Sequence, residues 1–373
     1  MSPRTVLISG GGIAGPALSY WLARHGFRPT VVERARGLRS SGSPVDVRGP
    51  ALPVAEAMGI MPRLRDVATR TTAMSVVDAS GRQVARIAMP ATRSAAGNRE
   101  VELPRGDLAA ALHEAARDDT ELLFDDTIVA LRQDGHGVDV TFERAAPRRF
   151  DLVVGADGLH STVRRLVFGP EAGFVRHMGL YVATLPLGGP AGHPHDVLVY
   201  NTPGRLVAVH PSRGDALAAF VFRGPAIDGF DHRDTELHRR IVAEAYAGAG
   251  WRVPELLERL RTTEELYFDS VSHVRSPAWA RGRVALLGDA ASCVSLFGDG
   301  SSLAIAGART LAEALAAHPA DHAGAFRRYE TEHRALVGPK QRGSGRAAAL
   351  LVPRTRLGIA ARNLAARAWP ARR

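Results

Sequence analysis

The chain has 373 residues, 45% of them hydrophobic and 23% charged, which is enough apolar material for two domains or one elaborated domain. Its only cysteine is Cys293, so an internal disulfide and a cysteine-rich metal site are excluded, and a reducing, cytoplasmic location is expected. The formal net charge is +10, almost all from arginine because Lys340 is the only lysine. No nucleic-acid motif accompanies these arginines, and no apolar run approaches the roughly 20 residues of a membrane helix, so neither partner is expected.

The N-terminal residues predict a strand, a glycine-rich turn and a helix. The aliphatic run Thr5–Ile8 is typical of a buried strand, and its position so near the start leaves no room for a signal peptide. Gly10, Gly12 and Gly15 follow at the spacing G-x-G-x-x-G, and Ala14–His25 has the apolar periodicity of a helix. A strand, this turn and a helix in that order are typical of a nucleotide-binding βαβ unit.

Each glycine of this turn has a separate physical task. Gly10 permits the tight turn, Gly12 lets a pyrophosphate approach the backbone, and Gly15 lets the helix touch the strand. The helix N-terminus at Ala14 offers free N–H groups and the positive end of the helix dipole to phosphates.

The next strand supplies the acidic residue that a nucleotide site requires. The strand expected over residues 30–32 ends at Glu33, which is placed to accept hydrogen bonds from ribose hydroxyls, with Arg34 beside it. The alternative is a glycine-rich turn without a ligand, in which Glu33 is an ordinary surface carboxylate.

Up to about residue 176 the pattern mixes short helices and strands. In order, we expect a polar loop (34–43), an extended piece (45–47), a helix (52–64), a hairpin turning at Ser80-Gly81 (72–89), a mobile loop (91–98), a helix opened by 104–107 and reaching 115, strands (121–131 and 138–142), a buried strand (150–155), and a short helix capped by Ser161 (162–166).

The pattern then changes to short strands joined by Gly-, Pro- and Asn-rich connections. Four of them, expected at 179–187, 196–200, 206–210 and 216–222, predict an antiparallel meander. Beyond it we expect helices (235–247 and 254–260), strands (266–274 and 283–287), two more helices (301–315 and 323–336), and a basic amphipathic helix in the tail (355–371).

Two later stretches resemble the first turn, because each places glycine and aspartate directly after a buried strand. Asp157 lies in Gly155–Gly158, at the edge of the sheet where ligands bind in open α/β folds, although a turn into a helix also favours Asp and Gly. Asp289 lies in Gly288–Ala291, where small residues permit close approach and the carboxylate can accept from ligand hydroxyls.

A glycine pair precedes the helix expected from residue 301. Gly298 and Gly300 flank Asp299, and the helix N-terminus that follows would stabilise negative charge in a bound ligand.

The three stretches, in this order and at these separations, resemble the FAD-dependent aromatic hydroxylases, a family that includes para-hydroxybenzoate hydroxylase and the tetracycline-inactivating monooxygenases. The matching motifs are the G-x-G-x-x-G turn with Glu33, the Gly155–Gly158 loop ending in Arg164, and Gly288–Ala291. Arg105, at a helix start, matches the flavin-contacting arginine of the family. The similarity extends over residues 5–336, in the middle by strand pattern more than by residue identity.

The resemblance implies an α/β fold with a three-layer, Rossmann-like FAD-binding domain, an inserted antiparallel β-sheet domain for the substrate, and a C-terminal helix. The expected divisions are 1–72, 98–175 and 277–340 for the FAD-binding domain, 73–97 and 176–276 for the substrate domain, and 341–373 for the C-terminal helical segment. The tail helix could lie on a membrane surface, but we expect it to pack along the FAD-binding domain.

The resemblance also implies FAD as cofactor, NADH or NADPH as electron donor, O2, and a small aromatic or polyketide-like substrate. In that chemistry the nicotinamide reduces the flavin, and O2 adds at C4a to give the hydroperoxide that hydroxylates the substrate. We expect a monomer or weak homodimer. The sequence assigns no catalytic acid–base residue. The candidate cofactor-binding residues are Gly10, Gly12, Ala14, Gly15, Glu33, Arg34, Arg105, Asp157, Asp289, Gly298, Asp299 and Gly300.

One stretch departs from the family pattern. The residues after Ala291 lack the usual proline, and Asp299 stands between the glycines, where a carboxylate would oppose negative charge on a reduced flavin. This altered stretch leaves a flavin-binding protein with impaired chemistry open as an alternative function. Flavin-dependent oxidation without hydroxylation (a Baeyer–Villiger reaction or dehydrogenation) is a second alternative. A plain NAD-dependent dehydrogenase is disfavoured because it would not need Gly288–Ala291.

Other polar residues are weaker candidates. His193, His195 and His210 lack a carboxylate at a recognisable metal-ligand spacing, so no metal site is expected. Tyr200 and His210 could serve as acid–base groups at a substrate, but packing is the expected role of each. Cys293 is expected to be a buried, inert thiol.

Overall fold

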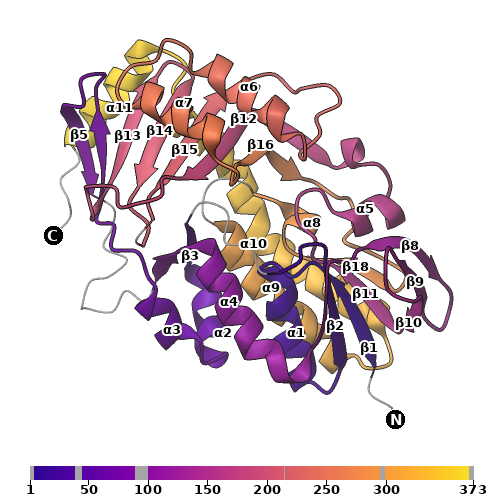
Figure 1. Cartoon of the computed structure of the whole chain (residues 1–373). Coiled ribbons are helices and arrows are strands. Elements are labelled where there is room, and N and C mark those ends of the chain that lie inside the picture. Colours follow the sequence, from indigo (N-terminus) through magenta and orange to yellow (C-terminus); the bar gives the residue numbers. More distant parts are fainter. Residues whose placement is uncertain (1–3, 38–43, 89–99, 214, 295–298, 369–373) are drawn as a thin grey trace.

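The computed structural model describes residues 4–37, 44–88, 100–213, 215–294 and 299–368. Two sheets dominate it, and Figure 1 shows them one above the other with a long helix, α10, running between them. The loop expected at 91–98 and Gly298 lie outside the described residues.

The first sheet is parallel except at one edge, and its four central strands are mostly buried. From edge to edge the order is β17 (Ala280–Arg281), β18 (Val284–Leu286), β11 (Leu152–Gly155), β1 (Thr5–Ser9), β2 (Arg28–Glu33) and β7 (Glu121–Phe124), with only β17 antiparallel. Such continuous aliphatic runs are typical of parallel strands covered on both faces.

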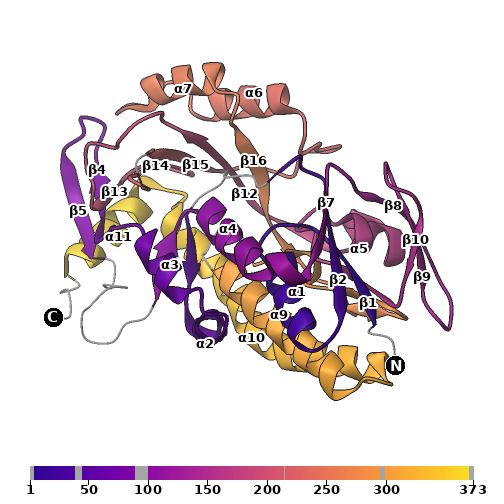
Figure 2. The same ribbon diagram turned by 60° about the horizontal axis from the view of Figure 1, so that its bottom comes forward.

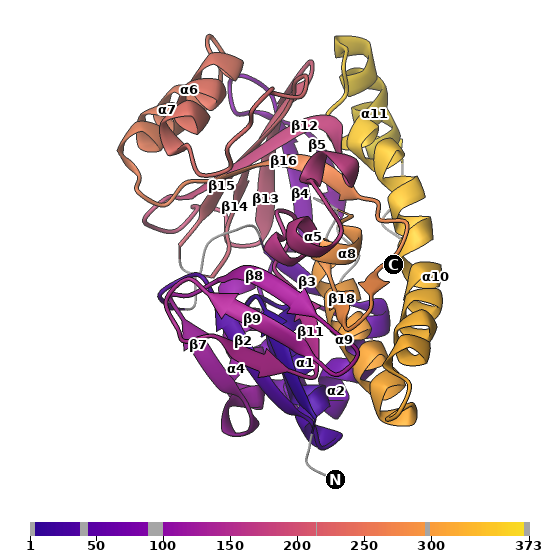
Figure 3. The same ribbon diagram turned by 90° about the vertical axis from the view of Figure 1, so that its right-hand side faces the viewer.

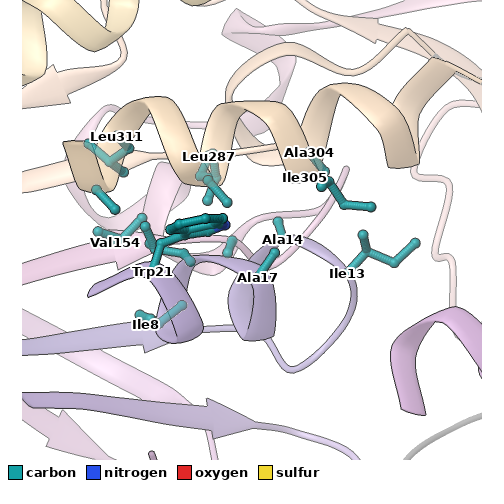
Figure 4. Close-up of a cluster of buried hydrophobic side chains, with 14 of the residues drawn as sticks. Ile8, Ile13, Ala14, Ala17, Trp21, Val154, Leu287, Ala304, Ile305 and Leu311 are labelled. Atoms are coloured by element: carbon teal, nitrogen blue, oxygen red, sulfur yellow. The ribbon is translucent and has the colours of Figure 1, made fainter. Parts of the chain in front are cut away.

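Two layers cover this sheet and give the three-layer arrangement expected from the sequence. One layer is helical: α1 (Ala14–Arg24), α4 (Arg105–Ala116) and α9 (Asp299–Ala317), backed by α10 (His322–Leu351). In Figure 4, Trp21 extends from α1 toward α9, where Leu311 lies. The other layer is the antiparallel sheet of β8 (Ile128–Gln133), β9 (Val138–Phe142) and β10 (Arg148–Phe150), whose apolar residues join the same core.

The second sheet has seven strands. The order is β16 (Tyr267–Val274), β12 (Val175–Pro186), β15 (Leu217–Arg223), β14 (Arg205–His210), β13 (Asp196–Thr202), β4 (Ala73–Val77) and β5 (Gln83–Ala88). Helices α6 (Thr235–Ala245) and α7 (Val253–Thr262) pack on one face, and the end of α10 packs on the other (Figures 1 and 2).

The remaining elements of the fold are mostly short. They are β3 (Val45–Val47), which pairs with β6 (Val101–Leu103); the helices α2 (Leu52–Ala57), α3 (Met61–Asp66), α5 (Thr162–Val167), α8 (Asp289–Ser292) and α11 (Arg356–Ala368); and the 3-10 turns Gly49–Ala51, Arg117–Asp119 and Glu171–Gly173.

The topology corrects the expectation of a wholly antiparallel second sheet. Strand β4 runs parallel to β13, because it arrives from a distant segment and no tight turn imposes an antiparallel direction. Strand β12 pairs with β15 instead of its sequence neighbour β13, so only β13, β14 and β15 form a simple meander.

Two expected elements are each divided in two. The helix expected at 52–64 stops at Gly59, whose φ of +73° ends α2 before α3 begins. The strand expected at 121–131 divides at Asp125, whose φ is +58°, and at Asp126, whose carboxylate accepts hydrogen bonds from the backbone N–H groups of Thr127 (2.8 Å) and Ala145 (2.9 Å). The two halves therefore join different sheets.

The expected position of the tail helix is wrong. α11 contacts β5 and β13 of the seven-stranded sheet and does not lie along the nucleotide-binding layers (Figure 1). Amphipathic periodicity predicts which face of a helix is buried, but not which surface buries it.

Candidate functional site

Four loops with glycine or acidic residues meet at one edge of the parallel sheet. The G-x-G-x-x-G turn follows β1, Glu33 ends β2, Asp157 follows β11, and Gly288-Asp289 follows β18. Because β1 pairs in parallel with β2 and β11, and β11 with β18, the carboxyl ends of all four strands lie together. Ligands bind at this edge in open α/β folds.

The glycines at this edge are required by close contacts. A Cβ on Gly15 would lie 1.9 Å from the carbonyl oxygen of Gly10, so only glycine lets α1 approach β1 this closely. Gly10 has a φ of +111°, and a Cβ there would lie 2.5 Å from the carbonyl oxygen of Ala156. Gly12 differs because no described heavy atom lies within 4 Å of its Cβ position, which leaves open space in front of it.

This open space faces the start of α1. Among the described residues, no side chain caps the first turn of α1, and that turn contains no acidic residue. Backbone N–H groups at a helix start that lack such partners favour an anion. Ala14, the first residue of α1, lies behind this position, 3.1 Å from a Cβ built on Gly288. The glycine turn and α1 therefore fit the pyrophosphate of a dinucleotide.

Glu33 is held in place by the backbone. Its carboxylate accepts hydrogen bonds from the N–H of Gly11 (2.7 Å) and the N–H of Ala35 (2.8 Å). It therefore closes the glycine turn from the side and keeps further lone pairs for a ribose hydroxyl.

Sequence reasoning missed His113, which supports the same turn. Its Nε2 lies 2.6 Å from the carbonyl oxygen of Gly11, and burial lowers the pKa of His113 although Gly11 and Glu33 favour its charged form. A neutral imidazole that donates from Nε2 fits this environment. Only the packing of α4 on α1 brings His113 here, so no motif could have indicated it.

Arg105 and Asp289 face the same region from different elements. Arg105 is the exposed first residue of α4, and Asp289 is the first residue of α8. Burial raises the pKa of Asp289, while the positive charge of Arg105 and a hydrogen bond with Cys293 oppose that rise. Tyr267, at the start of β16, is 41% exposed, and desolvation of its phenol within the protein raises its pKa, a rise that Arg105 again opposes. Arg105 therefore lies where the parallel layers meet the seven-stranded sheet.

Asp157 and Arg164 connect the loops at this edge. Asp157 accepts hydrogen bonds from Ser161 Oγ and from the N–H of Val163 (3.1 Å), and Ser161 Oγ caps α5 by accepting from the N–H of Arg164 (3.0 Å). The Arg164 side chain is completely buried and donates to the carbonyl oxygen of Ala290 (3.1 Å). Through Arg164 the Gly155–Gly158 loop therefore holds the Gly288–Ala291 loop in position.

Asp299, expected to oppose negative charge on a reduced flavin, is paired with two cations. Its Oδ1 lies 3.1 Å from Nη2 of Arg48 and 3.2 Å from Nζ of Lys340. The same end of α9 is fixed to β3, because Ser301 and Ser302 both donate to the carbonyl oxygen of Asp46 (2.7 and 2.9 Å). These two cations lie about 250 and 40 residues away along the chain, a separation at which the sequence carries no pairing signal.

Gly300 lies next to Asp289. A Cβ on Gly300 would lie 3.6 Å from Oδ1 of Asp289, so the start of α9 adjoins the third motif.

A histidine bridge joins the two sheets beside this region. Nδ1 of His160 lies 3.0 Å from Glu171, Nε2 lies 3.2 Å from Asp269 of β16, and the imidazole stacks on His232 at 4.2 Å. Burial would lower the pKa of His160, but its two carboxylate partners raise it to about 9. Burial is the largest cause that lowers the pKa of His232, and the positive charge of exposed Arg34 lowers it further. Arg34 therefore lies on the same side as His232.

The remaining polar candidates divide between the two faces of the seven-stranded sheet. Tyr200 is buried in the cluster under α6 and α7 and packs against Trp251 at 5.9 Å, which confirms the packing interpretation. His210 donates from Nε2 to Glu102 (3.2 Å) because its Nδ1 accepts from the N–H of Ser212 (2.9 Å). Burial would raise the pKa of Glu102, but His210 and two threonines lower it to about 2.

Within the described residues, no group of three or more His, Cys, Asp or Glu side chains has the arrangement of a metal site. None of the helices described is long and apolar enough to cross a lipid bilayer. Cys293 is buried, as expected, and its thiol hydrogen bonds with Asp289.

Comparison with known proteins identifies the family to which this chain belongs. A family described as "FAD binding domain" matches residues 4–338. The chain is 41% identical to an uncharacterized protein of Mycobacterium tuberculosis, over 91% of this chain and 92% of that one. It is 33% identical to a flavin-dependent monooxygenase of Legionella longbeachae, over 90% and 87%.

Among solved structures, the fold matches tetracycline destructase Tet(51) with a TM-score of 0.86 and 30% identity, covering 98% of this chain and 96% of that one. The chain belongs to the FAD-binding family, and its named relatives are flavin-dependent monooxygenases. The α/β fold, the three-layer cofactor region and the resemblance seen in the motifs are confirmed.

Proposed function

We propose that this protein is an FAD-dependent monooxygenase that uses NADH or NADPH and O2 to hydroxylate a small aromatic or polyketide-like molecule. The observation that carries the proposal is the meeting of four strand ends around the open space at Gly12. Bound FAD would supply the redox chemistry with O2, and the protein would supply binding, orientation and electrostatics.

The proposed FAD site follows the geometry of this edge. The N–H groups at the start of α1 would bind the pyrophosphate, and Glu33, fixed by two backbone hydrogen bonds, would accept from the ribose of the adenosine half. Arg34, exposed beside it, would face the same half. The cofactor-binding residues of this proposal are Gly10, Gly12, Ala14, Gly15, Glu33, Arg34, Arg105, Asp157, Asp289, Gly298, Asp299 and Gly300.

The flavin half of FAD would lie toward the Gly155–Gly158 and Gly288–Ala291 loops. Arg105 and half-buried Asp289 are electrostatically coupled, and both would bind polar groups of the ribityl chain. Asp157 accepts hydrogen bonds from Ser161 and Val163 in its own turn and from the hydroxyl of Ser9 at the end of β1 (3.4 Å), and its proposed contribution is to shape the loop that faces the cofactor.

The proposed division of the chain keeps the boundaries expected from the sequence: 1–72, 98–175 and 277–340 would bind FAD, 73–97 and 176–276 would bind substrate, and 341–373 would form a C-terminal helical segment. The seven-stranded sheet supports the substrate role because it borders the cofactor region through Tyr267 and through the Glu102–His210 hydrogen bond. We further propose a cytoplasmic location, which the single cysteine favours, and a monomer or weak homodimer.

The test combines a spectrum with isotope incorporation. The purified protein should show the two absorption bands of oxidised flavin, and NADH or NADPH should bleach them. Tetracycline is a suitable first substrate, because the solved structure Tet(51) is a tetracycline destructase. Transfer of one labelled oxygen atom from O2 to the product would support hydroxylation or ring expansion, which the product structure distinguishes.

Two outcomes would contradict the proposal. A protein that retains no FAD after reconstitution would remove the cofactor assignment. A protein that retains FAD and oxidises its substrate without incorporating labelled oxygen would instead be a flavin-dependent dehydrogenase, one of the alternative functions left open above.

A further inference from the structure

The junction between α10 and α11 is fixed firmly to the seven-stranded sheet. The carbonyl oxygen of Val352 accepts from Nε of Arg223 (2.9 Å), that of Leu351 accepts from Nδ2 of Asn201 (3.2 Å), and that of Pro353 accepts from the N–H of Gly204 (2.8 Å). Val352 is fully buried among the aliphatic side chains of the sheet. Helix α11 therefore starts from a rigid base.

The outward face of the C-terminal helices is apolar. Leu357 and Leu364 lie seven residues apart on α11 and are 83% and 67% exposed, and Leu350, at the end of α10, is 63% exposed. Ala360 and Ala361 are exposed between Leu357 and Leu364, whereas Ile359 and Arg362 are only partly exposed. We call the exposed residues Leu350, Leu357, Ala360, Ala361 and Leu364 the leucine stripe. Exposed leucines on a fixed helix are unfavourable in water unless another surface covers them.

The charge of the chain is concentrated in the same segment. Glu332 is the last acidic residue, and ten of the 48 lysines and arginines follow it. The first 332 residues therefore contain 38 residues of each sign, and the last 41 residues carry the whole formal charge of +10. Arg354 and Arg356 are exposed at the start of α11, next to Leu357.

An apolar stripe bordered by arginines on one exposed helix has the chemistry of an interfacial membrane helix. We propose that α11 and the end of α10 dock this protein on a membrane surface rich in anionic lipid. The leucine stripe would enter the boundary between head groups and acyl chains, while Arg354 and Arg356 would contact the lipid phosphates.

The positive charge of this segment favours an anionic membrane over a second copy of the chain as the surface that covers the leucine stripe. Two copies that met through their leucine stripes would bring together two segments without a single acidic residue, each carrying all of its protein's net charge. Like charges at a contact oppose association, whereas an anionic bilayer neutralises them. The inference concerns a surface remote from the glycine turn, and it stands independently of the proposed oxygenation. It revises the expectation, drawn from sequence, that no membrane partner exists.

The experiment measures cosedimentation of the full chain with vesicles. The vesicles contain phosphatidylglycerol and phosphatidylcholine in equal parts, or phosphatidylcholine alone. We expect binding to the mixed vesicles, with at least a tenfold weaker partition onto phosphatidylcholine, and a loss of binding as salt rises.

Two double variants test the two components separately. L357A/L364A shortens the exposed leucines, and R354Q/R356Q removes two charges; each should weaken binding to the mixed vesicles at least tenfold without lowering Tm. Matched controls at other sites are V129A, on the exposed side chain of β8, and R24Q/R28Q, which also removes two exposed arginine charges. Both controls should bind as the wild type does.

Three results would overturn the proposal. The first is absence of wild-type binding to the mixed vesicles. The second is an equal loss of binding in R24Q/R28Q and R354Q/R356Q, which would indicate nonspecific attraction of a basic protein. The third is a dimer in sedimentation velocity that L357A/L364A converts to monomer, since the stripe would then be an interface between copies.

Discussion

Replacing His160 with glutamine should remove most of the pH dependence of stability between pH 7 and 9.5. The imidazole lies between Glu171 and Asp269, at 3.0 and 3.2 Å, and is mostly buried. Stacked His232 does not share this charge, because burial and the charge of His160 lower the pKa of His232. The bridge is therefore one cation held by two carboxylates.

The sign and size follow from proton linkage. The pKa of His160 rises from 6.5 to about 9 on folding, so the folded state holds this proton more tightly than the unfolded state. The stabilisation is fully present below pH 6.5 and is lost as the pH rises through 9. The rise corresponds to at most about 3 kcal/mol of unfolding free energy, at about 1.4 kcal/mol for each pH unit.

Urea unfolding at pH 6.5, 8 and 9.5 measures this effect. The chain has one lysine and one cysteine, Lys340 and Cys293, so histidines dominate the titration in this window, and the difference between wild type and H160Q isolates the contribution of His160. Wild type should lose about 2 to 3 kcal/mol across the series, whereas H160Q should start lower and stay nearly level. The control is H136Q, since His136 is exposed in a turn. An equal pH slope in wild type and H160Q would refute the reasoning.

Three further predictions concern the proposed cofactor site. G12V and E33A should each weaken FAD retention, E33A by about 1.5–3 kcal/mol for one charge-assisted hydrogen bond, and unchanged dissociation constants in fluorescence titration would remove the assignment. R105A should lower FAD affinity while circular dichroism and Tm stay at wild-type values; wild-type affinity and flavin reduction rate would make Arg105 a surface residue only. D299N should shift the flavin potential positively by tens of millivolts, and K340M, which removes a partner cation of Asp299, should shift it negatively; a fall in Tm with both potentials unmoved would make Asp299 a purely structural residue.

Local chemistry explains which elements could be predicted from the sequence. The hairpin turning at Ser80-Gly81 and the Ser161 cap of α5 both form as expected, because each depends on residues a few positions apart. The separation of β7 from β8 could not be predicted, since Asp126 terminates the strand by accepting from Arg144 and Ala145, which lie in a later turn. Such long-range hydrogen bonds leave no local signal.

The same distinction applies to the candidate site. The glycine turn is recognisable because its spacing is a direct consequence of backbone contact. His113, which supports that turn, and Arg48 and Lys340, which neutralise Asp299, are brought in by the packing of separate helices and strands. Whether Asp299 acts as a bare charge therefore depends on tertiary structure, although its position between two glycines is visible in the sequence.

Helix α10 has a mechanical consequence for how ligands enter and leave. Its 30 residues extend over about 45 Å at 1.5 Å per residue. Its first half packs with α9 and the parallel sheet, through Phe326 and Tyr329, and its last turn is buried in the seven-stranded sheet, through Ala348 (Figure 3). One continuous rod thus ties both sheets together, and a hinge opening between them would have to bend it. Pro339 lies inside the rod and lacks the N–H that would bond to the preceding turn, so bending is easiest there. If α10 does not bend at Pro339, the two sheets keep a fixed separation. Small molecules must then enter and leave through movements of loops and side chains.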